Sequence, residues 1–241
     1  MPIGFRFRWI PFVATMSVVS IGIALGQWQT RRALEKEGIE ARMQVREALP
    51  PLALGSGALP LAELEYRHVR VRGEFVRDWA VYLDNRPYQG RAGFYMLMPL
   101  KIAGTDKAVL VARGWIPRNV ADRRKLPATV TPSGTVEIEG MVREHAARLF
   151  QLGTAEPLKP NAIVQNIEPA DFAAASQLSL LPFLIEQSGK EQDGLVRDWP
   201  RPSLGIDRHR GYAFQWFGLA ATAFLFFVVT GFRRGTRQTK K

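Results

Sequence analysis

The sequence predicts an α+β membrane protein in which two transmembrane helices flank a mainly antiparallel β domain, barrel- or sandwich-like, outside the cytoplasm. Three observations lead to this fold class: an uncharged apolar segment near each end of the chain, basic residues outside both segments, and a series of short strand-like segments between them. Basic residues collect on the cytoplasmic side of membrane helices. The expected topology is therefore a hairpin with both termini in the cytoplasm.

The first apolar segment follows a short basic N-terminus, residues 1–8, and covers residues 9–28. It is long enough to cross a bilayer, whose hydrocarbon core is about 30 Å thick. A cleaved signal peptide is the alternative, because Ala24 and Gly26 resemble a small-residue cleavage site. Trp28 at the far end favours a retained helix, since tryptophan anchors helices at membrane interfaces.

The second apolar segment, residues 209–232, predicts the other transmembrane helix. The part from Tyr212 to Phe232 contains no Asp, Glu, Lys or Arg, and a helix of this length extends about 30 Å. The alternative is a buried helix of a soluble protein, but the chain has too few apolar helices to surround one. Residues 233–241 form a basic tail, which marks the cytoplasmic side.

Residues 29–208 are expected to form the β-rich domain, preceded by a helical extension. Good helix formers from Thr30 to Leu49 predict that the first helix continues outward. Alternating apolar and polar residues predict a half-buried strand from His68 to Phe75. Further strands are expected at residues 80–83, 93–100, 108–113, 134–143, 162–167 and 181–186. One helix is expected at residues 169–177. Short strands at this spacing favour an antiparallel barrel or sandwich.

The composition excludes several classes of function. The chain has 33 Lys and Arg against 22 Asp and Glu, a net charge of +11. Most of this excess lies at the two ends, which fits the membrane topology and argues against a nucleic-acid partner. The chain has no cysteine and 3 histidines, so thiol chemistry and multi-histidine metal sites are not expected. Phosphate-binding loops and hydrolase motifs are also missing, so we do not expect an enzyme.

Several short motifs, in their order along the chain, resemble the surfeit locus protein 1 family of cytochrome c oxidase assembly factors, in its bacterial type. The motifs are Trp28-Gln29 with Arg32 and Lys36, Val69 to Phe75 (VRVRGEF), Leu110 to Pro117 (LVARGWIP), and His209 with Tyr212-Ala213 and Trp216-Phe217-Gly218-Leu219. One departure concerns the histidine, because family members often show Asn-Asn-His-Leu there. Here the sequence is Asp-Arg-His-Arg-Gly over residues 207–211, which changes the surroundings of the histidine.

The resemblance implies a non-enzymatic role in the bacterial inner membrane, with the central domain in the periplasm. The implied function is to assist insertion of haem a into the catalytic subunit of a haem-copper cytochrome c oxidase. That subunit, haem a synthase and the membrane are the implied partners, and haem a is the transient cofactor. A scaffold that holds an oxidase intermediate without binding any cofactor is the alternative.

A haem carrier needs an imidazole for the iron, aromatic surface for the ring and cations for the two propionates. We expect His209 to be the iron ligand. The other expected contacts are the aromatic residues Tyr212, Trp216 and Trp28 and the basic residues Arg208, Arg210 and Arg32. The alternative for the aromatic residues is plain anchoring at the membrane interface. Arg113, Gly114 and Trp115 are expected to have a structural role instead.

Overall fold

A computed structural model of the protein describes residues 5–55, 60–150, 157–190, 192–201 and 204–238. The chain divides into two compact units. One contains Met1–Arg42 with Arg201–Lys241, and the other contains Met43–Pro200. The first unit is helical and the second is built on a β-sheet. The predicted fold class, apolar terminal helices flanking a mainly antiparallel β domain, is confirmed.

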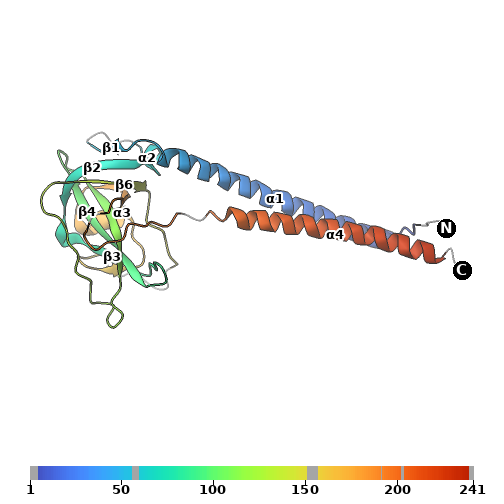
Figure 1. The fold of residues 1–241 in the computed structure, drawn as a ribbon. Coiled ribbons are helices and arrows are strands. Elements are labelled where there is room, and N and C mark those ends of the chain that lie inside the picture. The colour runs from blue at the N-terminus through green and yellow to red at the C-terminus, as the bar shows by residue number, and fades with distance from the viewer. Residues whose placement is uncertain (1–4, 56–59, 151–156, 191, 202–203, 239–241) are drawn as a thin grey trace. The chain divides into compact units, whose positions relative to one another are not determined.

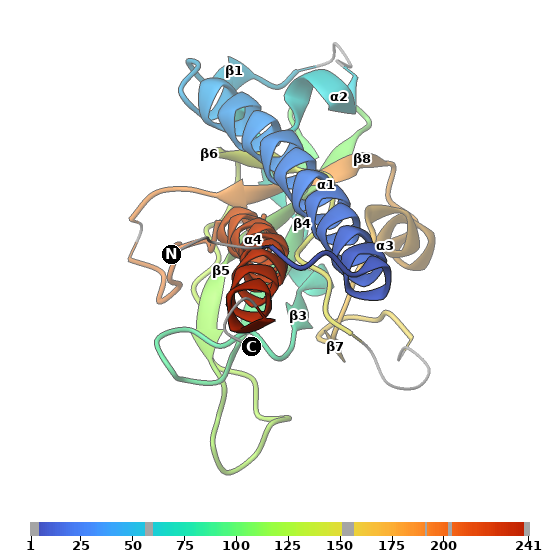
Figure 2. The same cartoon turned by 90° about the vertical axis from the view of Figure 1, so that its right-hand side faces the viewer.

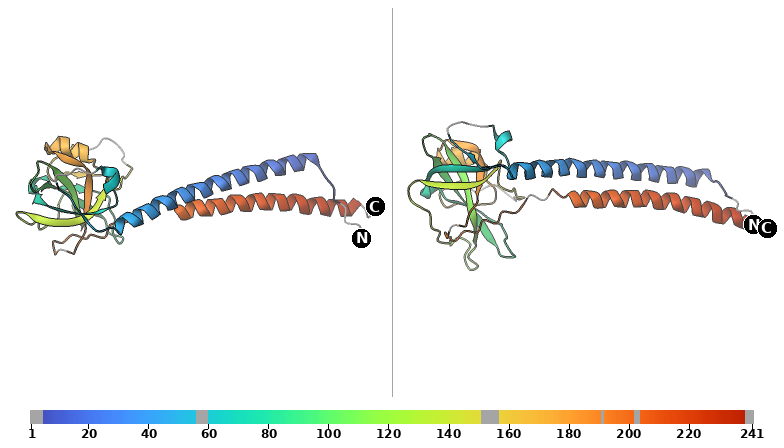
Figure 3. Two further views of the ribbon diagram at one scale, coloured as in Figure 1. Left: turned by 90° about the horizontal axis from the view of Figure 1, so that it is seen from above. Right: turned by 45° about the horizontal axis from the view of Figure 1, so that its top comes forward.

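The helical unit is formed by α1 (Trp9–Glu47) and α4 (Ile206–Gln238), which lie side by side and antiparallel (Figure 3). The unbroken α1 contains both the first apolar segment and its expected outward continuation. Both helices have a stretch long and apolar enough to cross a membrane, and only 11% of each stretch is buried. A core helix of a soluble protein would be mostly buried, so this alternative does not describe α4.

The β unit contains an 8-stranded sheet that closes on itself (Figure 1). The barrel consists, in order, of β2 (His68–Phe75), β6 (Val136–Arg143), β8 (Leu180–Gln187), β5 (Ala108–Pro117) and β4 (Gly93–Ile102). Closure comes from the end of β2, where Gly73, Glu74 and Phe75 pair with the end of β4. The structure therefore selects a barrel from the two predicted alternatives.

The smaller elements extend this barrel. They are β1 (Leu52–Ala53), α2 (Leu61–Leu64), the 3-10 helix η1 (Arg77–Trp79), β3 (Val81–Leu83), β7 (Ile163–Val164) and α3 (Pro169–Ser176). β1 and η1 were not predicted, because each is too short to show a periodic pattern. The pairs β1–β2, β3–β7 and β5–β8 are parallel. Parallel pairing of two strands needs a long connection between them. The connection from β5 to β8 is long enough, because it contains β6, β7 and α3.

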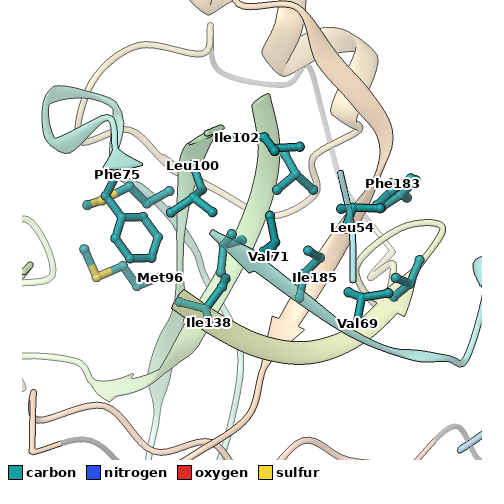
Figure 4. Close-up of a cluster of buried hydrophobic side chains, with 14 of the residues drawn as sticks. Leu54, Val69, Val71, Phe75, Met96, Leu100, Ile102, Ile138, Phe183 and Ile185 are labelled. Atoms are coloured by element: carbon teal, nitrogen blue, oxygen red, sulfur yellow. The ribbon is translucent and has the colours of Figure 1, made fainter. Parts of the chain in front are cut away.

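Apolar side chains fill the barrel (Figure 4). On β2 the predicted alternation is present: Val69 and Val71 are fully buried inside, whereas Arg70 and Arg72 are exposed. β5 is paired with β4 along most of its length and is buried on both faces; both strands are labelled in Figure 2. The outer face of β5 belongs to a second apolar cluster that includes Phe172 of α3. Both faces of this strand are therefore shielded from water, as in a sheet covered by helices.

Arg113 of β5 is the largest fully buried side chain in the described part of the protein, with 1% of its surface exposed. Its guanidinium donates hydrogen bonds to Thr131 Oγ1 at 2.7 Å, to the Val130 carbonyl oxygen at 3.1 Å and to Asp193 Oδ2 at 3.1 Å. Asp193 also accepts a hydrogen bond from the buried Arg197 at 3.2 Å. We call Arg113, Asp193 and Arg197 the barrel ion cluster. It joins the segment after β8 to the barrel wall.

The next two residues confirm the structural interpretation of this motif. Strand β5 continues past Arg113 to Pro117, so Gly114 lies within the strand, beside a bulge, and not at its end. A Cβ atom there would lie 2.8 Å from the Cβ atom of Leu195, closer than real Cβ contacts. Trp115 is buried and donates its indole N–H to the Arg86 carbonyl oxygen at 2.6 Å. Gly114 thus lets the segment with Leu195 pack closely against β5, and Trp115 ties the segment with Arg86 to the barrel.

Candidate functional site

Small residues bring α1 and α4 close together. The buried residues of α1, in a stripe at helical spacing, are Gly22, Gly26, Gln29 and Ala33. A Cβ atom on Gly22 would lie 3.0 Å from both the Ala220 Cβ atom and the Trp216 carbonyl oxygen of α4. Close approach through small residues is typical of helix pairs in membranes. The stripe therefore fixes how the two helices face each other.

His209 lies in the first turns of α4. The helix begins at Ile206, before the predicted start at residue 209. His209, Tyr212 and Trp216 are consequently all helical and share one face, as their spacing predicts. The imidazole of His209 is half-buried, so it remains accessible to a ligand.

Gln29 of α1 contacts this histidine directly. Its side-chain oxygen Oε1 lies 2.7 Å from Nδ1 of His209, a good hydrogen-bond distance. Gln29 is 9% exposed, so its amide is held within the helix pair. The other ring nitrogen, Nε2, has no hydrogen-bond partner among the residues that the structure describes. One side of the imidazole is thus fixed and the other is available.

Basic side chains surround the imidazole. Lys36, Arg208 and Arg32 lie close enough to His209 to act on it electrostatically. Arg32 is paired with Glu35, its Nη1 atom lying 2.9 Å from the carboxylate. Arg208 and Lys36 form no salt bridge with any described residue, so they are better placed to bind an added anion.

The other residues that the sequence predicts as haem contacts differ in their charge partners and in their exposure. Arg210 forms an ion pair with Glu37 of α1, with Nη2 2.8 Å from the carboxylate, so its charge is already partly balanced. Trp28 is 44% and Tyr212 46% exposed, and both rings offer aromatic surface. Trp216 is less exposed and lies two turns along α4 from His209. The structure therefore groups His209 with Arg208 and Arg32 more closely than with Arg210 or Trp216.

A hollow of about 560 Å³ lies at the start of α4, within the helical unit. The charged residues in its lining are Glu37, Glu40, Asp207, Arg208 and Arg210. Pockets for apolar ligands are lined mainly by hydrophobic and aromatic side chains. This hollow therefore suits polar groups and not an apolar ring.

Sequence reasoning did not include Gln29 and Lys36 among the site residues, although both belong to the motif at the end of the first apolar segment. A signal for Gln29 is present in the sequence. It continues the spacing of Gly22 and Gly26, which places a polar amide on the face where small residues admit a second helix. For Lys36 the sequence contains no comparable signal, because many basic residues surround it.

In the described parts of the chain, no group of three or more His, Asp or Glu residues can hold a metal ion. The arrangement instead offers one imidazole nitrogen, cations beside it and exposed aromatic rings. Such a set of groups suits a metal that is held in an organic macrocycle, because the macrocycle supplies the other ligands of the metal. A metal bound by several protein side chains would need ligands that this part of the structure does not bring together.

Comparisons with known proteins agree on one family. The sequence profile of the SURF1 family matches residues 16–221. A SURF1-like protein of Rickettsia felis is 32% identical over 228 residues, which cover 87% of this chain and 92% of that protein. Surfeit locus protein 1 of Homo sapiens is 28% identical over 233 residues, covering 88% of this chain and 74% of that protein. A SURF1-like protein of Monosiga brevicollis is 26% identical over 236 residues, covering 93% and 88%.

Proposed function

Because this chain belongs to the SURF1 family, and family membership implies a role in cytochrome c oxidase assembly, we propose that it binds haem a at His209 and assists its insertion into the catalytic subunit. The observation that carries this proposal is the half-buried imidazole, held on Nδ1 by Gln29 and accessible at Nε2. When bound, haem a would supply an iron that accepts a nitrogen ligand, an apolar ring and two propionates.

The residues present fit these three groups. The accessible Nε2 atom of His209 would hold the iron, because imidazole nitrogen is a common ligand of haem iron. Arg208 and Lys36, which have no acidic partner in the described part of the chain, can hold the propionates through charge-assisted hydrogen bonds. The exposed rings of Trp28 and Tyr212 can cover the macrocycle.

The position of the site also supports transfer within the membrane. His209 precedes the uncharged stretch from Tyr212 to Phe232 by less than one helical turn. A ligand of Nε2 would therefore sit at the junction of charged and apolar surface, which suits a ring with charged groups on one edge. We further propose that this junction lies at the periplasmic face of a bacterial inner membrane. The cofactor then needs only lateral movement to reach a membrane-embedded catalytic subunit, with haem a synthase as the candidate source.

The test compares purified full-length variants that are co-expressed with haem a synthesis. The wild type should copurify with haem a and show its Soret band, whereas His209→Ala should lose the band or shift it strongly. Membrane insertion should not change, because one side chain outside an uncharged span contributes little to insertion. His145→Ala is the matched control, since His145 lies in the β unit, and should keep the wild-type spectrum.

The scaffold alternative makes the opposite prediction. If His209→Ala binds haem a with an unchanged spectrum and stoichiometry, the ligand assignment is wrong. If the wild type copurifies with no haem but still restores oxidase assembly in a deletion strain, the protein acts as a scaffold. The first result would overturn His209 as the ligand, and the second would overturn haem binding.

A further inference from the structure

We propose that Gln29 is a positioning residue: by accepting a hydrogen bond from Nδ1 of His209, it fixes the ring and its tautomer so that Nε2 presents its lone pair to the iron. This inference rests on the proposed function, but it concerns a different residue on a different helix. It starts from the contact of 2.7 Å between Oε1 of Gln29 and Nδ1 of His209.

The direction of this hydrogen bond decides the tautomer. The side-chain oxygen of glutamine can only accept a hydrogen bond, so Nδ1 must carry the proton. In a neutral imidazole the other nitrogen then has the lone pair. Metal-bound histidines commonly donate their second N–H in this way, which fixes the ring orientation and raises the basicity of the ligating nitrogen. Gln29 thus prepares Nε2 of His209 as the ligand.

The cationic groups near His209 cannot replace Gln29 as a hydrogen-bond acceptor. Lys36, Arg208 and Arg32 act on the imidazole, but ammonium and guanidinium groups are donors only. Within the described residues, Gln29 is therefore the one acceptor bonded to the ring.

The helix pair holds Gln29 in place. It lies in the buried stripe of α1 between Gly26 and Ala33, and it is itself 9% exposed. A buried amide needs a hydrogen-bond partner, because leaving it unpaired costs the free energy of removing it from water. The contact with His209 supplies that partner for the oxygen. Gln27, two residues earlier, faces away from the stripe and is exposed, so it provides a matched control.

The experiment compares full-length wild type, Gln29→Leu and Gln27→Leu, with two independent readouts. The first needs no haem: solid-state NMR of protein labelled with [15N]histidine in lipid vesicles. The chain has 3 histidines, and the His209→Ala spectrum identifies the signals of His209. We expect a protonated Nδ1 and a bare Nε2 in the wild type and in Gln27→Leu. In Gln29→Leu the proton should shift toward Nε2, the tautomer that unrestrained imidazoles favour in water.

The second readout uses haem a added to the purified proteins. Gln29→Leu should bind it roughly 10–100-fold more weakly, the usual effect of losing a hydrogen bond to a metal-bound histidine. Its ferrous iron–histidine stretching band in the Raman spectrum should move to lower frequency. Gln29→Glu places a stronger acceptor against Nδ1, and this variant should move the band to higher frequency. Because Gln29→Glu keeps a polar side chain, it also tests the inference if Gln29→Leu proves unstable.

The results separate this inference from the proposed function. If the wild type binds haem a through His209 but Gln29→Leu keeps the wild-type tautomer, affinity and Raman band, the positioning role is wrong and haem binding stands. If the wild type binds no haem, the proposed function fails. The NMR spectra then still decide whether Gln29 sets the tautomer, and an unchanged His209 signal in Gln29→Leu would overturn that as well.

Discussion

The barrel and the helix pair each contain a polar side chain that forms hydrogen bonds to a segment distant in the chain. The two clusters of polar residues differ in whether a polar atom remains accessible to a ligand. In the barrel, the guanidinium of Arg113 bonds to Thr131, to the Val130 backbone and to Asp193, and it is shielded from solvent. In the helix pair, Gln29 bonds to one nitrogen of His209 while the ring stays half-buried.

This difference separates a structural role from a binding role. A buried charge must be paired and hydrogen-bonded, or its burial costs several kcal/mol. The bonds of Arg113 serve that need, and they tie the Asp193 segment to the barrel. His209 carries no such requirement at Nε2, which remains accessible beside Lys36 and Arg208, two cations that form no salt bridge with any described residue. Breaking the first cluster should therefore affect stability, and breaking the second should affect ligand binding.

The largest expected effect is on the barrel. Arg113→Met should lower the free energy of unfolding of the β unit by about 3 kcal/mol, because it leaves the carboxylate of Asp193, whose side chain is only 10% exposed, without one of its partners. The measurement is urea unfolding of the detergent-solubilised protein, followed by tryptophan fluorescence. Arg70→Met is the control: Arg70 is 52% exposed, and its ion pairs lie on the surface, so the loss should stay below about 1 kcal/mol. Equal effects for the two variants would show that the buried bonds of Arg113 contribute no more to stability than a surface ion pair does.

A second variant tests the helix pair without touching the polar residues. Gly22→Leu should force α1 and α4 apart, because even a Cβ atom there would lie 3.0 Å from a backbone oxygen of α4. Separation would break the contact between Gln29 and His209, so haem a affinity should fall by roughly tenfold or more. Titration of the purified protein with haem a measures this.

Gly38→Leu is the control for that variant. Gly38 lies on the same helix, but a Cβ atom there would meet nothing within 4 Å, so its affinity should equal that of the wild type. Unfolding of the β unit should be unchanged in both glycine variants. Wild-type affinity in Gly22→Leu would show that the close approach of the helices is not needed for binding.

The smallest expected effect distinguishes two arginines that flank the histidine. Arg208→Ala should weaken haem a binding several-fold, because Arg208 has no acidic partner among the described residues and can contact a propionate. Arg210→Ala should change it little, since Arg210 is already paired with Glu37. Binding titrations at low and high salt measure both, and the Arg208 effect should shrink as salt screens the charge. A larger loss for Arg210→Ala would reverse this assignment.

The sequence predicts the terminal helices, the strands and the position of His209 because each depends on local patterns. The run from Tyr212 to Phe232 is apolar enough to identify a span, and the alternation from His68 to Phe75 gives β2 with its correct buried face. The parallel pairing of β5 with β8 and the closure of β2 onto β4 depend on contacts between distant segments. Short periodic patterns do not contain that information.

The candidate site shows the same limit. Sequence reasoning identifies His209 and its neighbours on one helix, but Gln29 lies 180 residues away in the chain and meets the histidine only when the helices pack. The charge of Arg210 predicts a contact with a propionate, and only the structure shows its ion pair with Glu37. Residue type and spacing predict which side chains can act, whereas packing determines which of them are already engaged.

The most direct test of the central claim, that His209 is the haem ligand, is chemical rescue. In His209→Gly, co-expressed with haem a synthesis, the copurified haem a should be lost, and imidazole added to the protein with haem a should restore a wild-type absorption spectrum. The free imidazole then occupies the place of the missing side chain while the cations and aromatic rings remain. Retention of the wild-type spectrum by His209→Gly without imidazole would contradict the account, because another residue would then hold the iron.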